Sequence, residues 1–207
     1  MLIDAKTRRQ AALHLTKRDP VMAAIVRRVG PCRFAIDRGG GPFASLCEAI
    51  VYQQISGKAA VAIFGRLRER VGRRYPRPQD IARLDDAKLR GVGLSRQKIG
   101  YLRDLTARAV DGLPLHRVSR MHDEAAIQTL TEVKGIGRWT AHMYLMFRLG
   151  RLDVLPVDDY GIRKSLQKHY GLRSLPKPDR MTRVAEAWRP YRTLAAWYLW
   201  RALDMEG

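Results

Sequence analysis

Apolar residues recur at the three- and four-residue spacing of helices along almost the whole chain. No stretch alternates in the two-residue pattern of a half-buried strand. One helical face, for example, is formed by Phe43, Leu46, Cys47, Ile50 and Val51. The pattern predicts an all-α protein.

Capping residues and glycines mark the ends of these helices. Asp19-Pro20 has the form of an N-cap followed by proline at the first helical position, and Ser56 and Ser95 precede other periodic segments. Gly30 and Gly171 follow two of the segments. The expected helices are Val21–Val29, Phe43–Gln54, Lys58–Val71, Asp80–Leu84, Asp86–Val92, Arg96–Val110, Glu124–Val133, Arg138–Leu149, a helix from Asp158 or Asp159 to Tyr170, Asp179–Trp188 and Pro190–Asp204.

The glycine run Gly39–Gly41 is an early break, which suggests that the N-terminal helix packs with the C-terminal ones. We therefore expect two helical lobes: a discontinuous lobe of residues 1–41 and 151–207, and a central lobe of residues 42–150. The groove between two such lobes is the expected place for an active site.

The net charge of the chain indicates which class of partner the protein binds. The chain has 39 Lys and Arg against 20 Asp and Glu, a net charge of +19, while 46% of its residues are hydrophobic. A folded protein this basic is expected to bind a polyanion, nucleic acid above all. The alternative is an arginine-rich composition whose solvated faces are basic without a partner.

Several classes are excluded. The apolar runs are too short to span a bilayer, and the first ten residues contain no apolar export segment. Two cysteines, Cys32 and Cys47, cannot form a disulfide framework or a four-cysteine iron–sulfur site. We expect a soluble, cytoplasmic protein, associated with the nucleoid if bacterial, and a monomer.

The segment Leu130–Ala141 predicts two helices joined by a hairpin with glycines at 135 and 137. Glycine allows positive φ and leaves no Cβ between the backbone and a partner. The N–H groups in the first turn of the second helix have no partner within the helix, so they can bind a phosphate oxygen. The expected phosphate-binding residues are Lys134, Gly135, Gly137, Arg138 and Thr140. A plain helix–turn–helix corner is the alternative.

About twenty residues later the chain contains Pro-Val-Asp-Asp-Tyr. Taken with Ile50–Ser56, Gly93–Lys98, the hairpin and Trp188–Arg192, this segment resembles the helix-hairpin-helix DNA glycosylases, and among them the alkylpurine branch of the 3-methyladenine DNA glycosylase II type. The resemblance covers Pro42 to about Leu203.

The resemblance places the catalytic carboxylate at Asp159. We expect its neighbour Asp158 to have a capping or orienting role. Cleavage of an N-glycosidic bond builds positive charge on the sugar, which a fixed anion stabilises. The alternative for adjacent aspartates at a helix start is simple N-capping.

The resemblance also predicts the type of glycosylase. Members that cleave the backbone have a lysine nucleophile two residues after the second glycine of the hairpin, where this chain has Trp139. The chain thus resembles a monofunctional enzyme that uses water. Cationic alkylated purines can be selected between aromatic rings. The expected base pocket contains Trp200, Trp139, Tyr144, Tyr160 and Met143, although Met143 stands where the family has an aromatic residue. Core packing is the alternative for Trp200.

Gln54, with Gln53 before it, matches the wedge that fills the gap left by a flipped nucleotide. Ser95, Arg96 and Lys98 are expected to bind a phosphate. Helix capping is the alternative for the two glutamines and for Ser95.

The five histidines lack the spacing of metal ligands, so no side-chain metal site is expected. No organic cofactor is expected either. The resemblance implies a monovalent cation on hairpin carbonyls as an option.

The sequence therefore predicts a DNA glycosylase of base excision repair that flips alkylated purines, such as 3-methyladenine and 7-methylguanine, out of double-stranded DNA and leaves an abasic site. The alternatives are a non-enzymatic helix-hairpin-helix DNA-binding module and a glycosylase for deaminated or etheno bases. RNA binding is a more distant alternative, since no stacking sheet motif is present.

Overall fold

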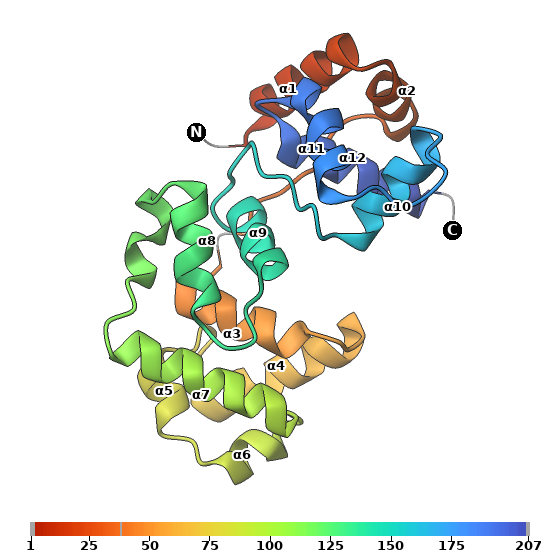
Figure 1. Cartoon of the computed structure of the whole chain (residues 1–207). Helices are drawn as coiled ribbons and strands as arrows, with labels where there is room; N and C mark the ends of the chain where they lie inside the picture. Colours follow the sequence, from red (N-terminus) through yellow and green to blue (C-terminus); the bar gives the residue numbers. More distant parts are fainter. Residues whose placement is uncertain (1–2, 38, 206–207) are drawn as a thin grey trace. The chain divides into compact units, whose positions relative to one another are not determined.

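The structure is a computed structural model that describes residues 3–37 and 39–205. Within these residues it contains helices and no strand, which confirms the all-α class (Figure 1). The elements are α1 (Ala5–Arg18), α2 (Pro20–Val29), α3 (Pro42–Tyr52), α4 (Gly57–Val71), α5 (Pro78–Ala82), α6 (Asp86–Gly91), α7 (Arg96–Val110), η1 (Leu115–Arg120), α8 (Asp123–Thr131), α9 (Arg138–Phe147), α10 (Tyr160–His169), α11 (Pro178–Ala185), η2 (Glu186–Trp188) and α12 (Arg192–Asp204).

The chain divides into two compact units. The first consists of Met1–Asp37 and His142–Gly207, and the second of Arg38–Ala141. The sequence suggests boundaries after residues 41 and 150. In the structure, the second boundary between the units lies inside α9, between Ala141 and His142. Gly150 follows the end of this helix and does not separate the two packed cores. The groove between the lobes stays a prediction.

A buried carboxylate joins the N-terminal and C-terminal parts of the first unit. Oδ1 of Asp19 caps α2 by accepting the backbone N–H groups of Val21 and Met22, at 2.9 and 3.1 Å. Its Oδ2 accepts the hydroxyl of Tyr170 at 2.5 Å and Nε1 of Trp188 at 2.9 Å. A buried carboxylate needs several such donors to offset its desolvation. The N-terminal helices therefore pack with the C-terminal ones, as the early glycine break suggested.

The core of the second unit lies where α3 packs against α4 and α7. Leu46 and Ile50 of α3, Leu67 of α4, and Leu102 and Leu105 of α7 are fully buried. Each such side chain contributes about 1.5–3 kcal/mol when it leaves water. This core fixes the end of α3 and the start of α7, two places where the sequence predicts DNA-binding residues.

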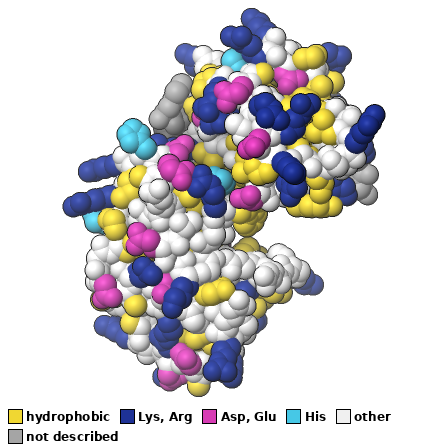
Figure 2. Space-filling view, in the orientation of Figure 1, with side chains coloured by type: hydrophobic (Ala, Val, Ile, Leu, Met, Phe, Trp, Pro, Cys, Tyr) yellow, Lys and Arg dark blue, Asp and Glu magenta, His cyan; other side chains and the backbone are white. Residues whose placement is uncertain are grey.

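Several arginines are used inside the second unit. Arg66 donates to the carbonyl of Val92 at 2.9 Å, and Arg73 and Arg77 pair with the nearly buried Asp80. Other Lys and Arg side chains are spread over the face shown in Figure 2. Part of the positive charge of the second unit is therefore used within the fold.

Several helices differ from the predicted ones; α8 and α9, for example, end two residues earlier than expected, at Thr131 and Phe147. The sequence analysis missed α1, which begins after Asp4, whose Oδ1 accepts the N–H of Thr7 at 2.7 Å. The helix α5 starts at Pro78, two residues earlier than expected. The expected last helices are α11, the 3₁₀ turn η2 and a shorter α12. The helix α3 ends at Tyr52, because Gln53 is extended and Gln54 has a φ of 55°.

Candidate active site and nucleic-acid-binding elements

Asp159 is held in a fixed orientation at the start of α10. It is the N-cap residue, and its Oδ1 accepts the backbone N–H of Ile162 at 2.8 Å. The same oxygen accepts Nε1 of Trp200 at 2.9 Å, from α12. The carboxylate is only 8% exposed. It lies at the N-terminal end of α10, the positive end of the helix dipole.

The expectation that Asp158 caps α10 is wrong. Asp159 makes the capping bond, and Asp158 is exposed to solvent. The residue predicted to be catalytic is therefore also the one that caps the helix. Capping does not exclude chemistry, because the bond to Ile162 fixes the direction of the carboxylate.

Two residues of this site were missed by the sequence analysis. The ring of Phe147 stacks on Trp200, with centroids 6.0 Å apart and planes 24° apart. Gly161 lies so close that a Cβ there would stand 3.2 Å from both Oδ1 of Asp159 and Cδ1 of Trp200. Phe147 shows no motif, whereas the glycine directly after Asp159-Tyr160 is a signal that could have been used.

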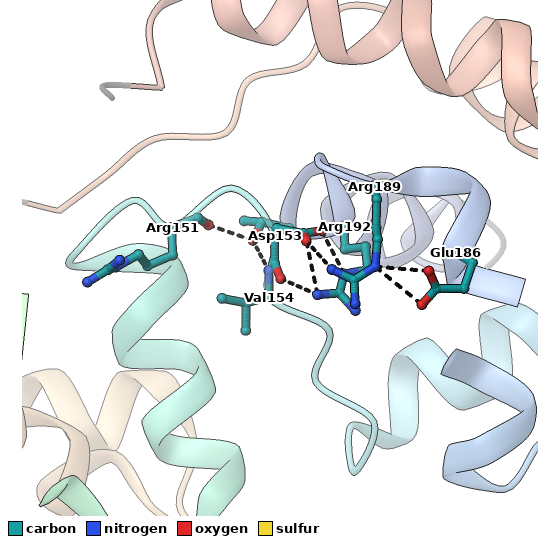
Figure 3. A network of polar contacts seen from close by, with 7 residues as sticks. Arg151, Asp153, Val154, Glu186, Arg189 and Arg192 are labelled. Atoms are coloured by element: carbon teal, nitrogen blue, oxygen red, sulfur yellow. Dashed lines mark hydrogen bonds and ion pairs between the residues drawn. The ribbon is translucent and has the colours of Figure 1, made fainter. Parts of the chain in front are cut away.

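A polar network connects the segment 151–154, which precedes Asp159, to the start of α12 (Figure 3). Asp153 accepts Nε of Arg192 at 2.6 Å and Nη1 of Arg189 at 2.7 Å. Thr193 donates to the carbonyl of Arg151 at 2.6 Å and accepts the N–H of Val154 at 3.1 Å. Since α12 also carries Trp200, this network sets the register between the loop of Asp159 and the helix of Trp200.

The other predicted pocket residues differ in exposure. In the first unit, Tyr144 is 7% exposed, Met143 is half-buried and Tyr160 is 62% exposed. Burial raises the pKa of Tyr144. Trp139 belongs to the second unit and is 44% exposed. Among the predicted aromatic residues, Trp200 donates a hydrogen bond to Asp159.

The two hairpin glycines serve different purposes. Gly135 has a φ of 83°, and a Cβ there would overlap the ring of Tyr101. Gly137 does not have a positive φ, and a Cβ there would meet nothing within 4 Å. The expectation of positive φ therefore holds for Gly135 alone. The open space at Gly137 is what the close approach of a partner requires.

The charged side chains at the hairpin are partly engaged. The backbone N–H of Lys134 donates to Oδ2 of Asp104 at 2.8 Å, while the lysine side chain is 74% exposed. Arg138 makes a two-point pair with Glu124 at 2.8 and 2.6 Å. The side chain of Thr140 is buried, so this residue can offer only its backbone to a phosphate.

At the start of α7, the structure separates three residues that were predicted together. Ser95 accepts the N–H of Lys98 at 3.3 Å and is the N-cap. Arg96 is exposed. Lys98 is 9% exposed, and its Nζ donates to the carbonyl of Val51 at 2.7 Å. The expectation that Lys98 binds a phosphate is therefore wrong, because its ammonium group is buried against the end of α3.

The predicted wedge lies in the turn after α3. Gln54 is exposed, and Gln53 is half-buried. Nε2 of Gln53 donates to the carbonyl of Gly135 at 2.7 Å. The structure thus connects the predicted wedge to the hairpin, 82 residues away in the sequence.

Residues 3–37 and 39–205 contain neither a cluster of metal ligands nor a membrane-spanning helix. No group of three or more His, Cys, Asp or Glu in that part of the chain is placed to hold a metal ion. None of its helices is long and apolar enough to cross a membrane. Cys32 and Cys47 are free cysteines.

The fold and these residues define an all-α helix-hairpin-helix protein with a fixed carboxylate. The model of the HhH-GPD superfamily of base excision DNA repair proteins matches residues 47–190, and the chain belongs to this superfamily. The resemblance found in the sequence is thereby confirmed.

Relatives and solved structures agree with this assignment. DNA-3-methyladenine glycosylase 1 of Schizosaccharomyces pombe is 34% identical over 197 residues, which cover 93% of this chain and 86% of the relative. The structure of the 3-methyladenine DNA glycosylase Mag1 from that organism, in complex with abasic DNA, has a TM-score of 0.78 and 35% identity, with 92% of this chain and 95% of that one covered. A DNA-3-methyladenine glycosidase of Bacillus halodurans has a TM-score of 0.84 and 34% identity, with 95% and 90% covered.

Proposed function

We propose that the protein is a monofunctional DNA glycosylase that removes alkylated purines from double-stranded DNA and leaves an abasic site. The observation that carries the proposal is the fixed carboxylate of Asp159, bonded to the indole of Trp200. The names of two relatives, DNA-3-methyladenine glycosylase 1 and DNA-3-methyladenine glycosylase 2, support the substrate class. The enzyme is a hydrolase that acts on N-glycosyl bonds.

Asp159 stabilises the charge that develops on the sugar. As the bond from C1′ to the purine nitrogen breaks, its electron pair leaves with the base and C1′ becomes positive. A cationic N3- or N7-alkylated purine leaves as a neutral base, so it needs little help from an acid. The carboxylate then orients a water molecule, whose oxygen bonds to C1′ and whose proton passes to the carboxylate or to solvent. The products are the free base and an abasic site.

Water is the expected nucleophile because no amine occupies the lyase position. Trp139 stands two residues after Gly137, where backbone-cleaving members of the family have a lysine. An indole cannot form a Schiff base with the sugar. The DNA strand is therefore left intact at the abasic site.

Trp200 has a second role as a surface for the flipped base. Its Nε1 donates a hydrogen bond to Asp159, and Phe147 stacks on the indole ring. We expect the base to stack on the opposite face, where cation–π attraction favours a positively charged purine. Trp139, Tyr144, Tyr160 and Met143 are the proposed companions in the pocket.

DNA is held by the hairpin and opened by the wedge. The open position at Gly137 and the exposed charge of Lys134 fit a phosphate, and Arg96 adds a second exposed cation. Gln54 is the proposed wedge. A carbonyl oxygen has two lone pairs, so the hairpin carbonyls also fit a monovalent cation, although that of Gly135 already accepts Gln53. Such an enzyme acts as a monomer on DNA in the cytoplasm or nucleoid.

Base release from alkylated DNA tests the proposal. The protein is incubated with methylated duplex DNA, and the free bases are identified by mass spectrometry. Release of 3-methyladenine or 7-methylguanine, with strand breaks only after alkali, is expected. Strand breaks without alkali would contradict the monofunctional mechanism. DNA binding without base release would favour a non-enzymatic helix-hairpin-helix module.

A further inference from the structure

The turn that carries the proposed wedge has a constrained backbone. Gln54 has a φ of 55°, and no other non-glycine residue in the described ranges 3–37 and 39–205 has a positive φ. Its side chain is exposed. A non-glycine residue in this conformation is strained and persists only where its surroundings hold it. The contacts that hold the turn are therefore informative.

The first contact is at the end of α3. The carbonyl of Val51 belongs to the last turn of the helix, where carbonyl groups lack partners and carry the negative end of the dipole. The helix has no basic residue in its own last turn. Nζ of Lys98, from the first turn of α7, supplies the missing donor at 2.7 Å in a buried position. Lys98 thus supplies a donor from α7 to the C-terminal end of α3, just before the turn begins.

The second contact is one residue before the wedge. Nε2 of Gln53 donates to the carbonyl of Gly135 at 2.7 Å. Gly135 lies close to Tyr101, because with its φ of 83° an added Cβ would overlap the ring of that residue. The hairpin therefore provides a rigid acceptor for Gln53.

We propose that Lys98 and Gln53 are positioning residues that preorganise the wedge, so that Gln54 enters the duplex in register with the hairpin that binds the backbone. Neither residue touches the flipped nucleotide. Lys98 fixes the start of the turn, and Gln53 fixes the distance between wedge and hairpin. This inference rests on the proposed function, because it assumes that a base is flipped.

The test compares two substrates that differ in the need for a wedge. A strand containing 7-methylguanine is supplied once in duplex and once single-stranded, and base release is measured under single-turnover conditions. The wild type is expected to act on both. Gln53→Ala and Lys98→Met are expected to lose at least about tenfold more activity on the duplex than on the single strand, and Lys98→Arg is expected to restore most of the loss. Gln128→Ala and Lys88→Met, exposed positions of the same unit, are matched controls.

A second measurement observes insertion without base release. A duplex carries a stable abasic analogue, with the fluorescent base 2-aminopurine opposite it. Insertion of Gln54 beside this base is expected to change its fluorescence with the wild type, and the change is expected to be lost in Gln53→Ala although the DNA is still bound. Because Gln53 is half-buried and not at the centre of the core, this variant tests the proposal even if Lys98→Met fails to fold.

The outcomes separate the two proposals. Equal losses on duplex and single strand, or an unchanged fluorescence response in Gln53→Ala, would overturn the positioning role and leave the glycosylase function intact. A wild type that releases no base from either substrate would overturn the proposed function, and with it this inference.

Discussion

The indole of Trp200 donates a hydrogen bond of 2.9 Å to Oδ1 of Asp159, across 41 residues of sequence. The same oxygen accepts the N–H of Ile162 at 2.8 Å. The carboxylate is therefore oriented from two sides, by the first turn of α10 and by α12. This arrangement gives the tryptophan a role in directing the carboxylate in addition to its proposed stacking on the base.

Trp200→Phe tests this directing role. The variant keeps an aromatic face but removes the N–H donor. A hydrogen bond to a charged group is worth about 1.5–3 kcal/mol, so single-turnover base release should slow by roughly 10- to 150-fold. Trp197→Phe, on the same helix, is the control and should stay near wild type. Equal rates for the two variants would contradict the directing role.

Asp153→Ala should destabilise the first unit. Arg192 is 13% exposed and would lose its two bonds to the carboxylate, keeping only the bond from Nη2 to the carbonyl of residue 153 at 2.7 Å. A cation left partly buried and poorly paired costs about 2 kcal/mol, which lowers Tm by roughly 4–8 °C in a chain of this size. Thermal unfolding measures the effect. Arg189→Gln, which removes a more exposed partner, should cost less, and a larger loss in that control would contradict the account.

Alanine should lower the stability of the protein at Gly135 but not at Gly137. Gly135→Ala forces a positive φ on alanine and overlaps the ring of Tyr101, so the variant should lose about 1–3 kcal/mol of stability. In Gly137→Ala the new Cβ meets nothing, so stability should change by less than about 0.5 kcal/mol.

The effect of Gly137→Ala should appear in DNA binding. A methyl group there would stand between the hairpin backbone and a phosphate, and Kd for duplex DNA should rise by about tenfold, the equivalent of one hydrogen bond. A binding titration at fixed salt measures it, because affinity for DNA depends steeply on salt. Unchanged affinity would mean that the hairpin does not approach the backbone at Gly137.

Asp104 gives the hairpin a pH dependence. Burial raises the pKa of its carboxyl, but the N–H of Lys134 and the guanidinium of Arg108 outweigh burial and hold the pKa below its usual 3.8. A lowered pKa in the folded state means that the stabilisation is present above the unfolded value and is lost as pH falls through the folded value. The Tm difference between wild type and Asp104→Asn should therefore shrink as pH is lowered from about 6 to below 4. A difference that stays constant over this range would contradict the assignment.

Helix starts could be predicted because their signals are local. The aspartate and proline at 19 and 20, Ser56 and Ser95 each cap the helix that they were expected to cap. The helix α1 was missed because its sequence is dominated by polar and basic residues, and its buried positions, Thr7, Ala11 and Leu15, form only a narrow apolar face.

The site was predicted only where a motif spans it. Asp159 and Trp200 were both predicted from the motifs, whereas the hydrogen bond between them depends on the packing of α10 on α12, where Ser165 donates to the carbonyl of Leu199 at 2.9 Å. Lys98 was misassigned because a sequence does not show that a lysine is buried. The bond from Gln53 to Gly135 depends on the fold of the whole second unit, and no local pattern indicates it.

The most direct test of the central claim is the single-turnover release of 7-methylguanine from methylated duplex DNA by the wild type and by Asp159→Asn. Asparagine keeps an acceptor for Ile162 and Trp200 and removes only the charge. The account predicts that the variant still binds abasic DNA but releases the base at least about 100-fold more slowly, as expected when electrostatic stabilisation of the transition state is lost. Base release at the wild-type rate by Asp159→Asn would contradict it.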